Sequence, residues 1–190
     1  MRGNDLVDIR LAAKESNWKR KGFLEKLFTQ EEKEIIIQSD DPQRMVWAFW
    51  SMKEAAYKIH TQLFGGRFFA PLKFSCALEA SGDGKVMIGQ AVYQTRTNFT
   101  KDYIYSVATA LDNKSSSQLN QCFILEVSED QSQYIYSVMI KEYAKLTSKS
   151  EEFITIIKDN NGIPFLEDKK ENRQIPVSIT HHGRYCAFII

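Results

Sequence analysis

The ten residues Trp50–Ile59, WSMKEAAYKI, decide how this chain is interpreted. They lie in a segment that opens with Asp41 and a proline and has no further proline or glycine before Gly65. An aspartate cap followed by proline is a typical helix start. Apolar residues recur through the segment at helical spacing, which predicts a long helix packed against a core.

The charged residues of this helix have two interpretations. Glu54 and Lys58 are four residues apart, so they lie on one face, and a surface pair of this kind contributes well under about 1 kcal/mol. Alternatively, a carboxylate and an ammonium point into a site, with Lys53 about a quarter turn from Glu54. Helical spacing alone favours the surface ion pair.

Composition and charge exclude several classes of protein. The 190 residues suit one large domain or two closely packed halves, and 43% are hydrophobic and 26% charged, as in globular proteins. A net charge of +1 gives no field that would favour nucleic acid or a membrane surface. Three widely spaced cysteines predict neither a disulfide framework nor a zinc site. Neither a signal peptide nor a membrane span is indicated, so we expect a cytoplasmic protein.

The segments around the long helix predict an α+β fold. Thr29 and Glu32 form a capping box before a short helix. Period-two alternation predicts strands at Asn4–Leu11, Leu72–Leu78, Lys85–Gln94 and Asp102–Leu111. The order strand, helix, strands then occurs again at Cys122–Val127, Gln131–Leu146, Phe153–Lys158 and Val177–Ile190. We predict two similar halves, residues 1–112 and 119–190, each with a helix on a small antiparallel sheet, joined by a linker at 113–118.

Three further stretches contain candidate site residues. Asp5 lies among apolar residues of a strand, where an acid is disfavoured unless it is paired, bound to metal or solvated at a sheet edge. His181 and His182 are adjacent in a strand and face opposite ways, so they cannot readily bind one metal together. The sequence Gly65-Gly66-Arg67 matches no Walker or Rossmann loop and most simply ends the long helix, although its arginine could approach a phosphate.

Together these stretches resemble the 4′-phosphopantetheinyl transferase superfamily. Gly3–Val7 is similar to its G-x-D-hydrophobic segment, Phe28–Glu32 to F-(S/T)-x-x-E, and Trp50–Lys58 to W-(S/T)-x-K-E-(A/S)-x-x-K. In the second half, Gly162–Phe165 and Val177–Tyr185 resemble a region of the larger, surfactin-synthetase-type members. That region precedes G-x-D in those enzymes and follows it here, which implies a circularly permuted pseudodimer. The alternative is a small subunit similar to holo-acyl-carrier-protein synthase with an extended C-terminal part.

The resemblance implies a reaction and roles for five residues. It implies Mg²⁺-dependent transfer of 4′-phosphopantetheine from coenzyme A to a serine hydroxyl of an apo acyl or peptidyl carrier protein, releasing adenosine 3′,5′-bisphosphate. By the same resemblance, Asp5 and Glu54 bind the metal, Glu54 and Lys58 are catalytic, and His181, Lys53 and Lys58 contact coenzyme A. A monomeric pseudodimer is expected rather than a trimer, with no nucleic-acid or membrane partner.

Departures from the family pattern leave an alternative open. Val7 stands where the larger enzymes have a second acid, and Asp8 points to the opposite face and is a poor substitute. His182 replaces the usual serine after the histidine. These features favour a non-catalytic scaffold that binds coenzyme A or a carrier protein. Carriers of fatty-acid, polyketide and peptide synthesis all remain open.

Overall fold

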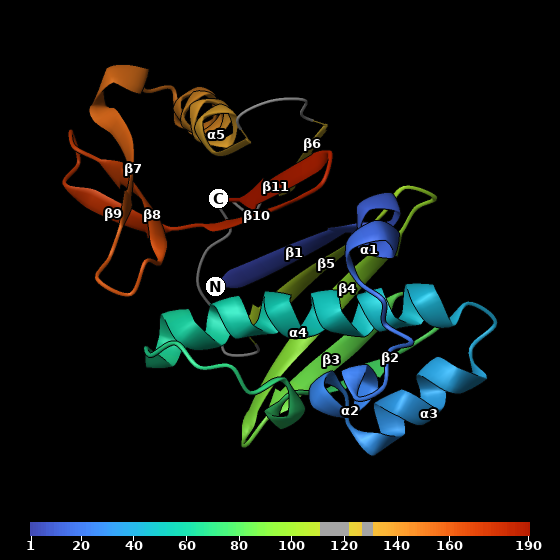
Figure 1. Ribbon diagram of the computed structural model, residues 1–190. Coiled ribbons are helices and arrows are strands. Elements are labelled where there is room, and N and C mark those ends of the chain that lie inside the picture. Colours follow the sequence, from blue (N-terminus) through green and yellow to red (C-terminus); the bar gives the residue numbers. More distant parts are fainter. Residues whose placement is uncertain (111–121, 127–130) are drawn as a thin grey trace.

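The computed structural model describes residues 1–110, 122–126 and 131–190 as two halves that pack against each other (Figure 1). The first half contains β1 (Arg2–Asp8), α1 (Ile9–Glu15), α2 (Phe23–Leu27), α3 (Gln30–Gln38), α4 (Pro42–Phe64), the 3₁₀ helix η1 (Pro71–Lys73), β2 (Ser75–Leu78), β3 (Asp83–Ile88), β4 (Ala91–Phe99) and β5 (Tyr103–Ala110). The second contains β6 (Cys122–Glu126), α5 (Gln131–Thr147), the 3₁₀ helix η2 (Glu151–Phe153), β7 (Ile154–Lys158), β8 (Pro164–Asp168), β9 (Arg173–Pro176), β10 (Ser178–His182) and β11 (Tyr185–Ile189). The α+β prediction is confirmed.

In the first half, α4 lies across one face of an antiparallel sheet with strand order β1-β5-β4-β3-β2 (Figure 1). Asp41 caps α4 by accepting a hydrogen bond from the Arg44 amide, and the helix ends at Gly65, as the sequence predicts. Gly3 permits the close approach of β1 to α4, because a Cβ there would overlap the carbonyl oxygen of Ala55. Neither α4 nor any other helix of the described residues is long and apolar enough to cross a membrane.

The second half repeats this topology. Strand β11 pairs with β6 and β10, while β8 pairs with β7 and β9. Only Val177 separates β9 from β10, so these two strands together take the place of one long strand. The strand order of the second half, β6-β11-β10/β9-β8-β7, then corresponds to the order β1-β5-β4-β3-β2 of the first half. A helix, α5, packs on β11 and β7, as α4 packs on the first sheet. The prediction of two similar halves is therefore confirmed.

Strand β1 joins the two halves because its two faces meet different partners. Val7 packs with α4 in the core of the first half. Leu6 instead belongs to a buried cluster with Tyr105, Tyr185 and Ala187, which come from both halves. The alternation of side chains along a strand thus places β1 between α4 and the strands β10 and β11.

The strand boundaries differ from the prediction where the chain turns. The strand predicted from Asn4 ends at Asp8, because the Asp8 carboxylate caps α1. Gly89 and Gly183 have positive φ angles of 55° and 59°, and each divides one predicted strand into a hairpin. Strands β8 and β9 were not predicted. The linker at 113–118 lies outside the described residues, so the half boundaries at 112 and 119 stay a prediction.

Candidate active site

Strand β1 and helix α4 bring Asp5, Glu54 and Lys58 together. Ser51, on α4, donates a hydrogen bond of 3.0 Å to the Asp5 carbonyl oxygen and so aligns the helix with the strand. Lys58 Nζ lies 3.4 Å from Asp5 Oδ1. Glu54 lies one turn before Lys58 on α4, and the charge of Asp5 acts on its carboxylate. Three of the predicted site residues thus meet although 49 positions separate Asp5 from Glu54.

Burial raises the pKa of both acids, and the charge of Asp5 adds to the shift of Glu54. Burial, reinforced by the negative charge of Asp5, raises the pKa of Glu54 to about 7, while Lys58 opposes the shift. Burial also raises the pKa of Asp5, against the opposing effects of Lys58 and a hydrogen bond from Thr180. Two such acids in a partly desolvated site are stabilised in their charged form by an added cation.

The chemistry of this pair fits a magnesium ion. The described residues contain no group of three or more His, Cys, Asp or Glu side chains that could hold a metal. Mg²⁺ takes oxygen ligands, keeps several waters and is commonly bound by one or two carboxylates together with substrate phosphates. Asp5 and Glu54 meet this requirement. Asp8 does not add to it, because its carboxylate is buried and bound to Arg184 and to the first turn of α1.

Lys58 connects the halves and does not pair with Glu54. Its ammonium donates hydrogen bonds of 2.7 Å to the Asn4 carbonyl and 3.1 Å to the Ile179 carbonyl, in addition to its contact with Asp5. These three acceptors match the three protons of an ammonium. The surface ion pair of Glu54 and Lys58 is therefore not formed.

Lys53 points away from the acids, toward the interior of the first half. The side chain is 2% exposed, and its Nζ lies 2.7 Å from Glu32 Oε2. The same nitrogen donates to the carbonyls of Leu27 and Pro71. These three acceptors match the three protons of the ammonium, and the coenzyme A contact of Lys53 stays a prediction. The fully buried ion pair instead holds α2, α3 and η1 against α4.

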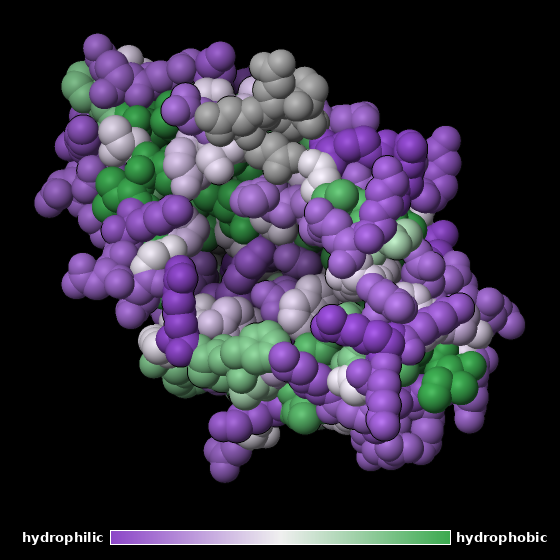
Figure 2. Space-filling view, viewed as in Figure 1, coloured by the Kyte–Doolittle hydropathy of each residue, from purple (hydrophilic) through white to green (hydrophobic). Residues whose placement is uncertain are grey.

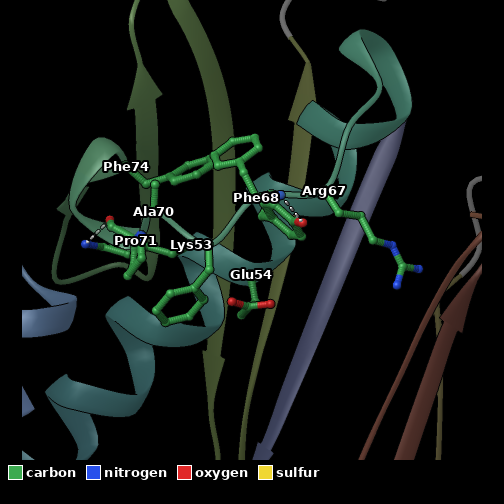
Figure 3. A pocket seen from close by; sticks show the side chains of 9 residues that line it. Lys53, Glu54, Arg67, Phe68, Ala70, Pro71 and Phe74 are labelled. Atoms are coloured by element: carbon green, nitrogen blue, oxygen red, sulfur yellow. Dashed lines mark hydrogen bonds between the residues drawn. The ribbon is translucent and has the colours of Figure 1, made fainter. Parts of the chain in front are cut away.

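Two cavities meet at Glu54. The first, of about 350 Å³, has aromatic walls that include Tyr57, Phe68 and Phe74 (Figure 3). The second, of about 360 Å³, lies between the halves, where Figure 2 shows the surface hollowed. Glu54, Tyr57 and Arg67 line both cavities.

The side chains of His181 and His182 face opposite sides of their strand, as the sequence predicts. His181, on β10, is exposed and lines the second cavity together with Glu54 and Lys58. His182 faces the other way and accepts a hydrogen bond of 2.9 Å at Nδ1 from the Asp8 amide. The structure thus brings His181 into the cavity that contains the predicted first-half residues, and gives His182 a contact between the halves.

Sequence reasoning missed Thr180 and Asn4. The Thr180 hydroxyl donates a hydrogen bond of 3.1 Å to Asp5 Oδ1, so the second half orients an acid of the first. Asn4 is fully buried, with its side chain bonded to Ser178 and Tyr105. A polar residue on the same strand face as Leu6 was the available signal for Asn4. Nothing in the sequence showed that Thr180 faces Asp5.

The family model of the 4′-phosphopantetheinyl transferase superfamily matches residues 2–110, more than half of the chain. The chain belongs to this superfamily. The matched region contains Asp5, Glu54 and Lys58 and ends with β5, so it coincides with the first half of the pseudodimer. The chain is thus assigned to a superfamily of transferases. A comparison with curated protein sequences gave no significant match.

Similar solved structures include three holo-acyl-carrier-protein synthases. The enzyme from Neisseria meningitidis is 16% identical with a TM-score of 0.48, and the similarity covers 57% of this chain and 95% of that one. The enzyme from Helicobacter pylori, in complex with coenzyme A, is 17% identical with a TM-score of 0.46, covering 58% and 99%. The enzyme from Thermotoga maritima is 10% identical with a TM-score of 0.44, covering 92% and 83%.

Proposed function

We propose that this 4′-phosphopantetheinyl transferase superfamily member transfers the phosphopantetheine group of coenzyme A to a serine hydroxyl of an apo carrier protein. One observation carries the proposal. Glu54, from the half that matches the family, borders a cavity that the second half completes with His181, and Thr180 of the second half holds the neighbouring acid Asp5. Since one chain supplies both sides of this cavity, we expect the active unit to be a monomer.

We assign the steps of the proposed reaction to these residues. The serine oxygen forms a bond to the β-phosphorus of coenzyme A, the bond from that phosphorus to the bridging oxygen breaks, and adenosine 3′,5′-bisphosphate leaves. Glu54 accepts the serine proton, since a carboxylate within reach of the attacking hydroxyl can serve as a general base. Asp5 and Glu54 would hold Mg²⁺, which when bound supplies charge neutralisation for the diphosphate. Thr180 keeps one oxygen of Asp5 oriented.

The two cavities suit the two arms of coenzyme A. The aromatic walls of the first fit the weakly polar pantetheine arm. The second contains Lys158 and His181, which can donate to phosphate oxygens, and thus fits the nucleotide arm. The diphosphate then lies near Glu54, where the cavities meet.

The proposal predicts a gain of mass by the carrier protein. Apo acyl carrier proteins and apo peptidyl carrier proteins are incubated with the chain, coenzyme A and Mg²⁺, and their masses are measured. We expect at least one carrier to become heavier by one phosphopantetheine group. Omitting coenzyme A, or replacing the acceptor serine by alanine, should abolish the gain. Unchanged masses across the whole panel would contradict the proposed activity.

Mg²⁺ should also stabilise the protein in the absence of coenzyme A. At a magnesium concentration ten times the Kd, we expect about 1.4 kcal/mol of added unfolding free energy, or a Tm higher by roughly 3–6 °C. The shift should disappear in Asp5→Asn and persist in the control Asp83→Asn, since Asp83 is an exposed acid paired with Arg96 on another part of the surface. An equal shift in both variants would place the magnesium elsewhere.

A coenzyme A-binding scaffold is the second candidate. The observation in its favour is that Lys58, the predicted phosphate contact, already has three protein acceptors. Calorimetry separates the candidates: a scaffold would bind coenzyme A with the same affinity with and without Mg²⁺ and would convert no carrier. Binding that strengthens with Mg²⁺ would support the transferase.

A further inference from the structure

Arg67 is a cation at the junction of the two cavities. It follows Gly65 and Gly66, whose φ angles of 69° and 74° turn the chain away from the end of α4. Its side chain lines both cavities and extends from this loop toward the strands of the second half (Figure 3). Within the described part of the chain, Arg67 has no carboxylate or carbonyl partner.

The other first-half cations near the acids are already engaged. The ammonium of Lys58 is held by two carbonyls and Asp5, and that of Lys53 by Glu32 and two carbonyls. Since no acceptor among the described residues is bonded to the guanidinium of Arg67, its five N–H donors can serve a ligand. A planar guanidinium can donate two parallel hydrogen bonds to phosphate oxygens.

The second half leaves room for this guanidinium. Gly162 lies in the turn between β7 and β8, and a Cβ added to it would lie 2.5 Å from Arg67 Nη2. The side chain of Arg67 therefore reaches from the first half to the second, where its guanidinium lies next to Gly162. Of the three residues that line both cavities, Glu54, Tyr57 and Arg67, only Arg67 is a cation.

We propose that Arg67 binds the diphosphate group of coenzyme A. This inference rests on the proposed function only in taking coenzyme A as the ligand. The diphosphate is the middle of that molecule, with the pantetheine arm on one side and the nucleotide on the other, so its place is where the two cavities meet. The 3′-phosphate, at the end of the nucleotide arm, lies farther into one cavity.

Binding measurements on the whole protein, without carrier protein, test this assignment. In Arg67→Gln we expect the Kd to rise about 10- to 100-fold for both coenzyme A and dephospho-coenzyme A, and to stay unchanged for pantetheine, which has no phosphate. Arg67→Lys should fall between wild type and Arg67→Gln, because it keeps the charge but not the two parallel donors. The control Lys85→Gln removes an exposed cation of β3, outside both cavities, and should bind as wild type does.

A second variant tests the contact from the other half. Gly162→Asn introduces a Cβ against the guanidinium, while asparagine tolerates the positive φ of 73° better than most residues. We expect it to weaken coenzyme A binding in the wild-type background and to add little in Arg67→Gln, so the two effects should not be additive. Fully additive effects would show that Gly162→Asn acts elsewhere.

The outcomes separate this proposal from the proposed function. An unchanged Kd for coenzyme A in Arg67→Gln overturns the role of Arg67, even if the carrier is modified. A loss seen with coenzyme A but not with dephospho-coenzyme A overturns the diphosphate assignment in favour of the 3′-phosphate. Normal coenzyme A binding that depends on Arg67, without modification of any carrier, supports the role of Arg67 and overturns the transferase.

Discussion

Glu54→Gln should give a folded protein that modifies its carrier at least about 100-fold more slowly than wild type. Glutamine keeps the shape of the side chain but can neither accept the serine proton nor supply a charged ligand to Mg²⁺. The measurement is the initial rate of carrier mass gain at saturating coenzyme A and Mg²⁺. Glu25→Gln, which removes an exposed acid of α2, should retain the wild-type rate.

The same variant should be at least as stable as wild type when no metal is present. Because the pKa of Glu54 is raised from 4.5 to about 7 on folding, the folded state binds more protons than the unfolded state between these values. The free energy of unfolding of wild type therefore falls as the pH rises through that range, by on the order of 3 kcal/mol. Urea unfolding in EDTA at pH 8 should show Glu54→Gln more stable by up to this amount. Loss of both activity and folding in Glu54→Gln would contradict the assignment of Glu54 as a site residue.

Lys53→Met should have the largest effect on stability, lowering the free energy of unfolding by about 3–5 kcal/mol. Methionine fills much of the same volume, but it leaves the Glu32 carboxylate buried at 1% exposure without its counter-charge. It also leaves the carbonyls of Leu27 and Pro71 without a donor. Equilibrium unfolding in urea, followed by tryptophan fluorescence, measures the loss.

A double variant distinguishes the ion pair from general damage to the core. Glu32→Gln removes the charge and keeps one oxygen acceptor, which can serve only one of the two amides, of Thr29 and Cys76, that Glu32 binds. Combined with Lys53→Met, it should recover part of the lost stability. If Lys53→Met instead unfolds at the wild-type urea concentration but weakens coenzyme A binding, the result would support the prediction of Lys53 as a coenzyme A contact.

Local signals were sufficient to predict helices α3 and α4. The capping box of Thr29 and Glu32 forms as predicted, and α4 begins after Asp41 and ends at Gly65. These signals work because a cap satisfies backbone groups within one turn of itself. The sequence also predicted that Asp5 and Glu54 belong to one site, but through the family resemblance and not through spacing.

The roles of the lysines depended on contacts between distant segments. Lys53 and Lys58 lie on one helix five residues apart, yet one is buried against Glu32 while the other meets a strand of the second half. Helical periodicity places both near the core and cannot state which partner each has. Thr180 and Asp5 are 175 residues apart, so their hydrogen bond depends on how the halves pack.

The repeated strand order allows the two halves of the chain to carry different residues and different functions. In β1 the first half has Asn4 and Asp5 at the centre of the strand, whereas the matching strand β6 has apolar residues from Phe123 to Leu125. In an assembly of identical subunits, every copy must carry the acids and the histidine, because each copy serves on both sides of a site. Two joined halves are free of this requirement. The duplicate that lacks the acids can specialise as a wall of the cavity, so we expect the chain to bind one coenzyme A and not two.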